Sequence, residues 1–95
     1  MAYRTHVSII ADVLITAKQY SYEGYDNGAT VTNLIRKANV PYGRLSSIVS
    51  QLTRSGLLQT IPDASVKYRI SEKGIEFLNA YNDFKGFVET FGLKV

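Results

Sequence analysis

Cysteine is absent from this 95-residue chain, and its absence removes several kinds of chemistry together. Without thiols the protein forms no disulfides, no thiolate metal sites and no cysteine nucleophiles. A cysteine-free composition fits a reducing compartment such as the cytosol. We therefore expect a cytoplasmic protein.

Long apolar runs are absent as well. No stretch approaches the roughly 20 consecutive apolar residues that a membrane-spanning helix needs, and the opening residues MAYRTHVSII lack the layout of a signal peptide. With 45% hydrophobic and 20% charged residues, the composition is that of a folded protein rather than a disordered one. We expect one soluble domain that has no contact with a membrane.

The residue sets that support catalysis or metal binding are also missing. The single histidine, His6, has no second histidine or paired carboxylate at ligand spacing, which favours an ordinary surface or half-buried side chain. The sequence contains no carboxylate pair, nucleophile–base set or glycine-rich phosphate loop. A chain of this length also leaves little core around a deep cleft. The sequence therefore predicts neither an enzyme nor a cofactor or metal site.

The positive charge is concentrated in the middle of the chain. The net charge is only +3, but residues 36–70 hold six cations and one acid, a sum of +5. Residues 1–35 hold two cations and three acids, and residues 71–95 hold three cations and four acids, so each flank sums to −1. Since a basic patch is the usual mark of a polyanion-binding surface, the middle segment is the candidate functional region.

Two helices are predicted in this region, one after the other. The hydroxyl of Thr30 can cap the first, and Arg36 and Lys37 lie in its last turn, where cations also stabilise the negative end of the helix dipole. After a tight connection, the second runs from Pro41, placed in its first turn, to Ser55, and Gly56 stops it. Its apolar face consists of Leu45, Ile48, Val49 and Leu52.

The opposite face of the second helix carries no acid. It consists of Tyr42, Gly43, Arg44, Ser46, Ser47, Ser50, Gln51 and Arg54. A solvated helix face usually mixes acids and bases, whereas a face that meets phosphates and base edges favours hydroxyls, amides and guanidinium groups. Structural explanations compete for two members: Tyr42 can pack on the core, which we slightly favour, and Arg54 can stabilise the helix dipole. Arg44 and the serines have no comparable structural explanation.

A hairpin and a final helix follow. Leu57 and Leu58 begin a strand, residues 62–65 form a turn, and the return strand alternates apolar residues with Lys67 and Arg69, which puts both cations on one face. Ser71 can cap the final helix. One stripe of that helix, with spacings of four and three, is Phe77, Tyr81, Phe84, Val88 and Phe91. Ile75 and Leu78 lie on a neighbouring face, so we expect the helix to cover its own domain and a second subunit.

The beginning of the chain is predicted to be structural. Residues 5–18 form an amphipathic helix by spacing, with Val7, Ile10, Ala11, Leu14 and Ala17 facing inward and Ile9 and Val13 widening the stripe. After Gln19 the run YSYEGYDNG breaks every periodicity and predicts a loop. Its tyrosines, Tyr20, Tyr22 and Tyr25, can stack on bases, but we favour covering the edge of the core.

These features together resemble a known family. The resemblance rests on Gly28-Ala29-Thr30 with Thr32, Lys37-Ala38-Asn39-Val40, Tyr42 and Leu45, Gly56-Leu57-Leu58, Tyr68-Arg69-Ile70-Ser71 with Lys73-Gly74, and Phe77-Leu78 with Tyr81. The chain resembles the small archaeal winged helix-turn-helix DNA-binding proteins, predicted transcriptional regulators that include basic chromatin-type proteins dimerising through a C-terminal antiparallel coiled coil. Two departures stand out: the wing tip, residues 63–65, lacks basic residues, and Gly86 lies inside a short last helix.

The resulting prediction is a mainly α protein with a small β-hairpin wing, in which residues 1–71 form the winged helix-turn-helix domain and residues 72–95 the C-terminal helix. We expect a nucleoid-associated homodimer that binds double-stranded DNA and acts as a transcriptional regulator. The helix 41–55 enters the major groove, and the wing 57–70 lies on flanking backbone. The predicted DNA contacts are Arg36, Lys37, Tyr42, Arg44, Ser46, Ser47, Ser50, Gln51, Arg54, Lys67 and Arg69. The alternative is a protein-interaction module that uses the aromatic stripe.

Overall fold

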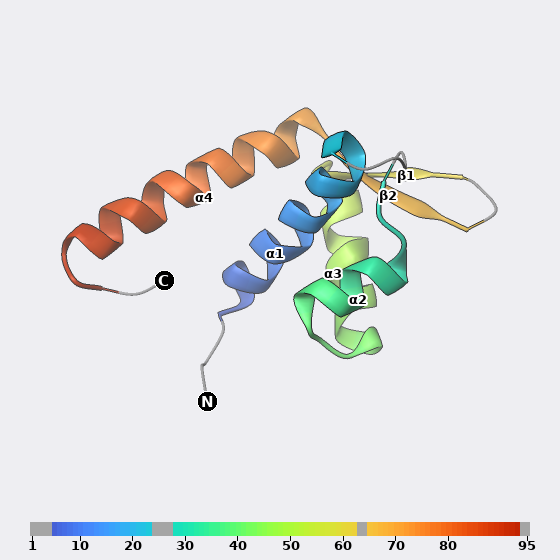
Figure 1. Cartoon of the computed structure of the whole chain (residues 1–95), viewed down its shortest axis with the longest axis horizontal. Helices are drawn as coiled ribbons and strands as arrows, with labels where there is room; N and C mark the ends of the chain where they lie inside the picture. Colours follow the sequence, from blue (N-terminus) through green and yellow to red (C-terminus); the bar gives the residue numbers. More distant parts are fainter. Residues whose placement is uncertain (1–4, 24–27, 63–64, 94–95) are drawn as a thin grey trace.

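Four helices and one antiparallel hairpin make up the protein in the computed structural model, which describes residues 5–23, 28–62 and 65–93 (Figure 1). The first elements are helix α1, His6–Lys18, and a π-helical turn, Gln19–Glu23. They are followed by α2, Val31–Ala38, and α3, Tyr42–Arg54. Strands β1, Leu58–Ile61, and β2, Lys67–Ile70, precede α4, Glu72–Thr90. The predicted class, mainly α with a β-hairpin, is confirmed.

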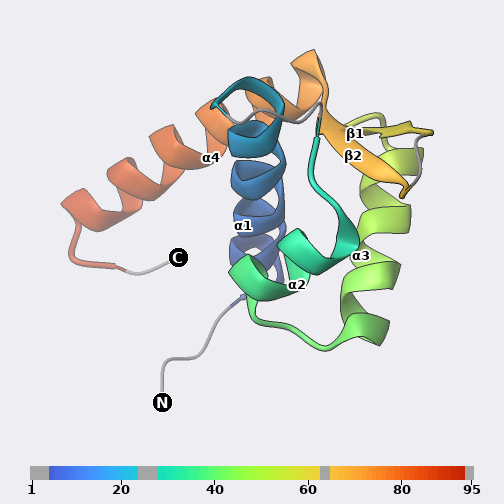
Figure 2. The ribbon, with the colours of Figure 1, turned by 45° about the vertical axis from the view of Figure 1, so that its right-hand side comes forward.

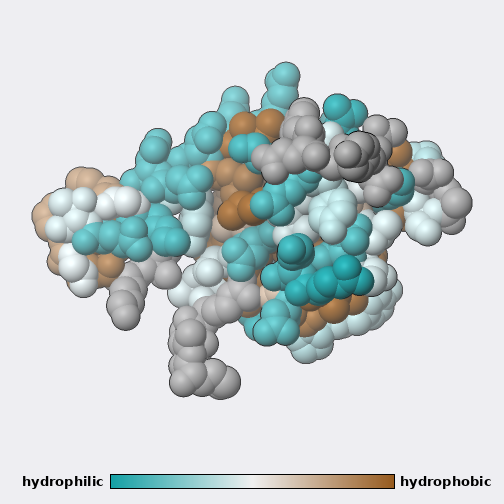
Figure 3. Space-filling model, in the orientation of Figure 1, coloured by the Kyte–Doolittle hydropathy of each residue, from teal (hydrophilic) through white to brown (hydrophobic). Residues whose placement is uncertain are grey.

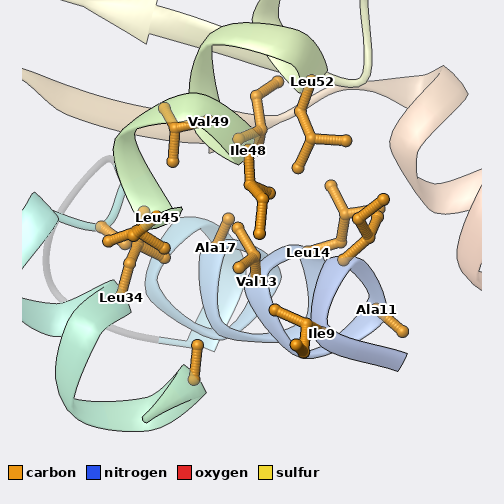
Figure 4. Packing of buried hydrophobic residues seen from close by; sticks show 14 of the residues in the cluster. Ile9, Ala11, Val13, Leu14, Ala17, Leu34, Leu45, Ile48, Val49 and Leu52 are labelled. Atoms are coloured by element: carbon orange, nitrogen blue, oxygen red, sulfur yellow. The ribbon is translucent and has the colours of Figure 1, made fainter. Parts of the chain in front are cut away.

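The core lies where the first three helices meet. Helix α1 is central, with α4 on one side and the α2–α3 pair on the other (Figure 2). Their apolar faces interdigitate, and the side chains of Leu14, Leu34 and Leu45 are completely buried (Figure 4). Leu58 and Ile70 close this core from the hairpin. Burying such aliphatic side chains is the main stabilising contribution to a domain of this size.

Side-chain caps define where three of the helices begin. The hydroxyls of Thr5 and Ser71 accept hydrogen bonds from the backbone N–H groups of Ser8 and Gly74. Thr30 caps α2 as predicted, and Asn33 completes a reciprocal capping box. Helix α3 begins differently, because Pro41 is extended and immediately precedes the helix instead of lying in its first turn. Each cap satisfies N–H groups that the helix itself leaves unpaired.

The residues that follow α2 and α3 explain the tight connections on either side of α3. Asn39 adopts the left-handed conformation, with φ of 56°, and turns the chain from α2 towards α3. Gly56, with φ of 82°, follows the end of α3 as predicted. The following strand begins at Leu58, one residue later than expected.

The register of the hairpin decides which side chains share a face. Leu58 pairs with Ile70 and Thr60 with Tyr68, whereas Gln59 pairs with Arg69 and Ile61 with Lys67. Because side chains alternate along a strand, the first two pairs share one face and the last two pairs share the other. Beyond the hairpin, Ala29 forms an isolated antiparallel bridge with Tyr68, so the segment before α2 is paired with β2.

Two predictions about the first third of the chain are wrong. The π-helical turn continues α1 through Glu23, where a loop from Tyr20 onward was expected. Ser21 holds this turn, since its hydroxyl donates to the Ala17 carbonyl and accepts a hydrogen bond from the Ile70 amide at 3.4 Å. Val7 is 44% exposed, because the buried arc of α1 lies further round the helix.

The tyrosines of the same stretch have different outcomes. Tyr20 packs partly buried against the core, as favoured. Nothing is described of the side chain of Tyr22, and Tyr25 lies outside the described residues. The described helices include none that is long and apolar enough to cross a bilayer.

Helix α4 covers the domain with its first half only. Leu78 is buried, and Ile75, Phe77 and Tyr81 pack half-buried against the core. The second half projects away from the other elements and ends in a hydrophobic surface (Figures 1 and 3). Phe84 and Phe91 are 58% and 65% exposed there. Gly86 does not interrupt the helix, which is continuous to Thr90.

Two glycines in α4 provide a matched test of the packing beneath its first turn. A Cβ added at Gly74 would lie 2.5 Å from the Leu57 carbonyl oxygen and 2.6 Å from Ile70 Cγ1. We expect Gly74→Ala to lower the free energy of unfolding by about 1–3 kcal/mol, despite the better helix propensity of alanine. Gly86→Ala is the control, since nothing lies within 4 Å of its added Cβ. Equal losses of urea stability in both variants would contradict this packing.

Candidate functional site

The solvent-facing side of α3 is the candidate functional surface. Leu45, Ile48, Val49 and Leu52 are buried in the core, as their spacing predicts. All predicted polar members of the opposite face are exposed: Arg44, Ser46, Ser47, Ser50, Gln51 and Arg54. Tyr42 is 63% exposed, so the interpretation that it packs in the core is wrong. The structure thus presents this face to solvent without an acidic side chain.

Four stripes divide the exposed face of α3, because residues seven apart lie about 20° apart around a helix. Gly43 and Ser50 form one of the two central stripes. Arg44 and Gln51 form the stripe on one border. Ser47 and Arg54 form the other central stripe. Ser46 and Thr53 form the stripe on the other border, and they line depressions that also contain residues of the hairpin. Arg44 and Ser46 therefore lie on opposite borders of the exposed face, with Ser47 and Ser50 between them.

A groove of about 630 Å³ lies between α3 and the hairpin. Its α3 wall consists of Ser47, Val49, Ser50, Thr53 and Arg54, and its hairpin wall consists of Thr60 and Tyr68. A smaller hollow of about 60 Å³ adjoins it, shares Val49, Ser50 and Tyr68 with it, and reaches Val31 and Tyr42. Tyr68 therefore lies between the two hollows. Among the residues that the structure describes, none that lines either hollow is a carboxylate.

The cations of the hairpin lie on its other face. Lys67 and Arg69 alternate with Tyr68 and pair with Ile61 and Gln59, so the structure does not bring them together with the exposed face of α3. Arg69 and Gln59 instead line a separate depression with Ser71, Glu72 and Lys73 near the start of α4. Lys67 and Arg69 each take part in an interaction within the protein.

The two cations of α2 form a third location. Arg36 and Lys37 are exposed in its last turn, next to the left-handed Asn39. They are absent from the linings of the groove and the hollow beside α3. The eleven predicted contact residues thus occupy three surfaces: the α3 face, the outer face of the hairpin and the end of α2.

Sequence reasoning missed three residues of the groove: Thr53, Thr60 and Tyr68. The sequence predicts Tyr68 only as one of the residues that alternate with Lys67 and Arg69 and as part of the family resemblance, but its half-buried ring packs against the core and also lines the groove. Thr60 lies opposite Tyr68 across the hairpin. The signal that could have found both is the strand register, which requires the turn to be placed correctly.

This arrangement of a short helix, a tight turn, a second helix with an exposed polar face and a hairpin can be compared with known families. Residues 3–89 match the family described as winged helix-turn-helix. The chain belongs to that family. In its terms, α2 and α3 form the helix-turn-helix and the β1–β2 hairpin forms the wing.

Solved structures similar to this chain include one DNA-binding protein and one putative DNA-binding protein. The crystal structure of Sso10a-2, a DNA-binding protein from Sulfolobus solfataricus, superposes with a TM-score of 0.75 at 22% identity, covering 93% of this chain and 85% of that one. A putative DNA-binding protein from Ralstonia eutropha JMP134 has a TM-score of 0.63 at 17% identity, covering 77% of this chain and 93% of that one. These similarities show a shared fold. A comparison with curated proteins finds no match.

Proposed function

We propose that this winged-helix protein binds double-stranded DNA by inserting α3 into the major groove. The observation that carries the proposal is the acid-free exposed face of α3, which offers hydroxyl, amide and guanidinium donors along the whole helix. DNA phosphates accept hydrogen bonds and repel carboxylates, so a face that has many donors and no carboxylate is suited to bind a DNA duplex. The two similar structures, both of proteins named as DNA-binding or putatively so, support the same function.

The residues of α3 have distinct roles in this proposal. Arg44 contacts a guanine edge or a phosphate, because a guanidinium can bind either with two hydrogen bonds. Ser46, Ser47, Ser50 and Gln51 contact phosphates or base edges, and Arg54 contacts phosphate. Tyr42, which is exposed at the start of α3, packs against the DNA backbone.

The remaining predicted cations act at the periphery. Arg36 and Lys37 at the end of α2 attract the phosphates that border the major groove. Lys67 and Arg69 lie on the face of the wing opposite to Tyr68. They can therefore contact flanking DNA backbone only outside the groove between α3 and the hairpin. Their contribution is therefore long-range attraction, which salt screens over about 10 Å at 0.1 M.

We further propose that the projecting half of α4 pairs with the same segment of a second copy. Phe77, Phe84 and Phe91 recur every seven residues, as do Tyr81 and Val88, which is the spacing of a coiled-coil seam. The domain itself covers Phe77 and Tyr81, but the seam continues over exposed Phe84 and Phe91. A two-fold pairing matches one apolar patch with itself, so a second copy supplies the missing cover. Such a dimer can place two α3 helices on successive turns of one duplex, about 34 Å apart.

Transcription regulation is the cellular role that we propose for this DNA binding. Selection of bound sequences from random duplexes checks it. We expect a defined motif, because the α3 face combines Arg44 and Gln51, which can read guanine and adenine edges. Recovery of no motif would indicate an architectural protein that compacts DNA without reading sequence.

DNA affinity should depend strongly on salt. If each subunit neutralises four to six phosphates, the slope of log K against log salt is about −4 to −5, at roughly 0.9 per phosphate.

We expect Arg44→Ala to cost about 1–3 kcal/mol of binding free energy with little effect on stability, since the side chain is exposed. Fluorescence anisotropy with a labelled duplex measures the salt slope of the wild type and the loss of binding free energy in Arg44→Ala.

Lys18→Ala is the matched control for Arg44→Ala. It removes the same charge from an exposed position at the end of α1, outside the surfaces assigned to DNA. We expect a change below about 0.5 kcal/mol. A slope near zero for the wild type would reject DNA binding, and equal losses in the two variants would mean that net charge, rather than the α3 face, determines affinity.

The dimer is tested by placing a charge in its seam. Phe84→Asp should convert the dimer to a monomer in sedimentation equilibrium, because a carboxylate buried between two helices is left without a partner. Asn79→Asp adds the same charge to the same helix at an exposed position outside the seam and should leave the dimer intact. A wild-type protein that stays monomeric at high concentration would contradict the pairing.

A further inference from the structure

We propose that the small hollow beside the first half of α3 receives the C5 methyl group of a pyrimidine base, which in unmodified DNA is thymine. The proposal rests on the DNA binding proposed above and specifies one class of base that this surface recognises. It gives a role to an uncharged part of the surface that the charge pattern of the sequence does not identify.

The walls of the hollow combine a buried apolar part with a more exposed polar part. Leu45 and Val49 are 0% and 5% exposed, and Val31 is half-buried beside them. The other lining residues all carry hydroxyl groups: Tyr42, Ser46, Ser50 and Tyr68. Because the aliphatic side chains are the more deeply buried, they form the inner end of the hollow, and the hydroxyl groups surround its entrance.

The volume of the hollow limits what can occupy it. It measures about 60 Å³. By comparison, a cavity of about 150 Å³ holds a benzene ring, and one water molecule takes up about 30 Å³ of the liquid. An aromatic effector or a flipped base is therefore too large for the hollow, whereas a methyl group, which is close to water in size, fits.

The charge around the hollow separates it from the larger groove. Its lining residues, all within the described part of the chain, include no acid, lysine, arginine or histidine, whereas Arg54 lines the groove. A phosphate oxygen that entered the hollow would lose water without gaining a counter-charge. An apolar group is instead favoured when it leaves water. The hollow therefore suits a methyl group better than it suits the DNA backbone.

Thymine is the base that offers such a group in the major groove, where apolar side chains contact its C5 methyl. A helix that fills this groove has one strand of the duplex along each of its borders. The hollow lies on the border of α3 that carries Ser46, whereas Arg44 and Gln51 lie on the other border. The two borders therefore recognise bases by different chemistry, hydrogen bonds on one and an apolar contact on the other.

The hollow is already formed in the free protein, because hydrogen bonds hold the elements around it. The backbone of Tyr68 exchanges two hydrogen bonds with Ala29, with N–O distances of 2.9 and 2.8 Å. Thr30, the residue before Val31, caps α2 in a reciprocal box with Asn33. These contacts fix the start of α2 and strand β2 before DNA binds. A methyl group can therefore enter with little of the side-chain ordering that weakens binding elsewhere.

Replacement of thymine by uracil tests the proposal with the unmodified protein. Deoxyuridine keeps every hydrogen-bonding group and charge of thymidine and lacks only the C5 methyl. We expect about fourfold weaker binding when the thymine at the hollow is replaced, which corresponds to burial of one CH₂-sized group at about 0.8 kcal/mol. Fluorescence anisotropy measures this in the tightest-binding selected duplex, with each thymine replaced in turn. At the position so identified, 5-methylcytosine should bind more tightly than cytosine, because the methyl group is restored.

Ser46→Leu and Ser47→Leu are matched variants that locate the effect. They place the same apolar side chain at neighbouring exposed positions of α3, but Ser46 lines the hollow and Ser47 does not. In Ser46→Leu the leucine fills the hollow, so thymine and uracil duplexes should bind equally. Ser47→Leu should keep the fourfold preference for thymine. The measured quantity is the ratio of two affinities, so a general loss of DNA affinity in either variant does not affect the comparison.

The outcomes distinguish this proposal from DNA binding itself. If the wild type binds DNA but no replacement of thymine by uracil weakens binding, the methyl site is overturned and DNA binding by α3 stands. The same conclusion follows if Ser46→Leu keeps the preference or if Ser47→Leu loses it as well. If Ser46→Leu fails to fold, the uracil series with the wild type decides. If the wild type binds no duplex, both proposals fail.

Discussion

The two backbone hydrogen bonds between Ala29 and Tyr68 hold the wing beside α3. They join the segment just before α2 to the second strand of the hairpin, so the helix-turn-helix and the wing are connected by more than their covalent link. Gly28 permits this approach, because a Cβ at that position would lie 2.7 Å from the Tyr68 carbonyl oxygen. Burial of Leu58 and Ile70 beneath the hairpin then fixes its tilt. The width of the groove beside α3 follows from these contacts.

The sequence predicts α3, but it does not predict which face of the wing lies beside this helix. The buried positions of α3 recur at helical spacing, and Gly56 follows its end, so its C-terminal limit and its exposed face follow from local pattern. Alternation along β2 likewise identifies two faces of the strand. It does not decide which face lies beside α3, because that depends on the register with β1 and on the bridge to Ala29, which lies 39 residues away in sequence. The sequence thus predicts that Lys67 and Arg69 share one face of β2, but it does not predict that this face is turned away from α3.

The error at the beginning of the chain and the unpredicted extent of the cover over α4 have a common physical cause, which is long-range contact. Ser21 is held in a π-helical turn by the Ile70 amide, 49 residues further along, and no local propensity predicts that partner. In α4 the heptad spacing runs unbroken from Phe77 to Phe91, yet the rest of the domain covers only its first half. Periodicity identifies which side chains share a face, but tertiary structure determines how far along the helix that face is covered.

Local charge pattern outweighs net charge in this protein. A net charge of +3 on 95 residues is too small to direct a protein to DNA by itself, and the flanking segments are each net negative. Helix α1 lies between α4 and the α2–α3 pair, and α4 projects away from that pair, so the acids carried by α1 and α4 belong to elements on one side of it (Figure 2). Charges more than a Debye length away, about 8 Å at physiological salt, are largely screened, so the nearest side chains act most strongly on a phosphate that binds α3 as we propose. On the exposed face of α3 these nearest side chains carry hydroxyl, amide and guanidinium groups, and none of them is a carboxylate.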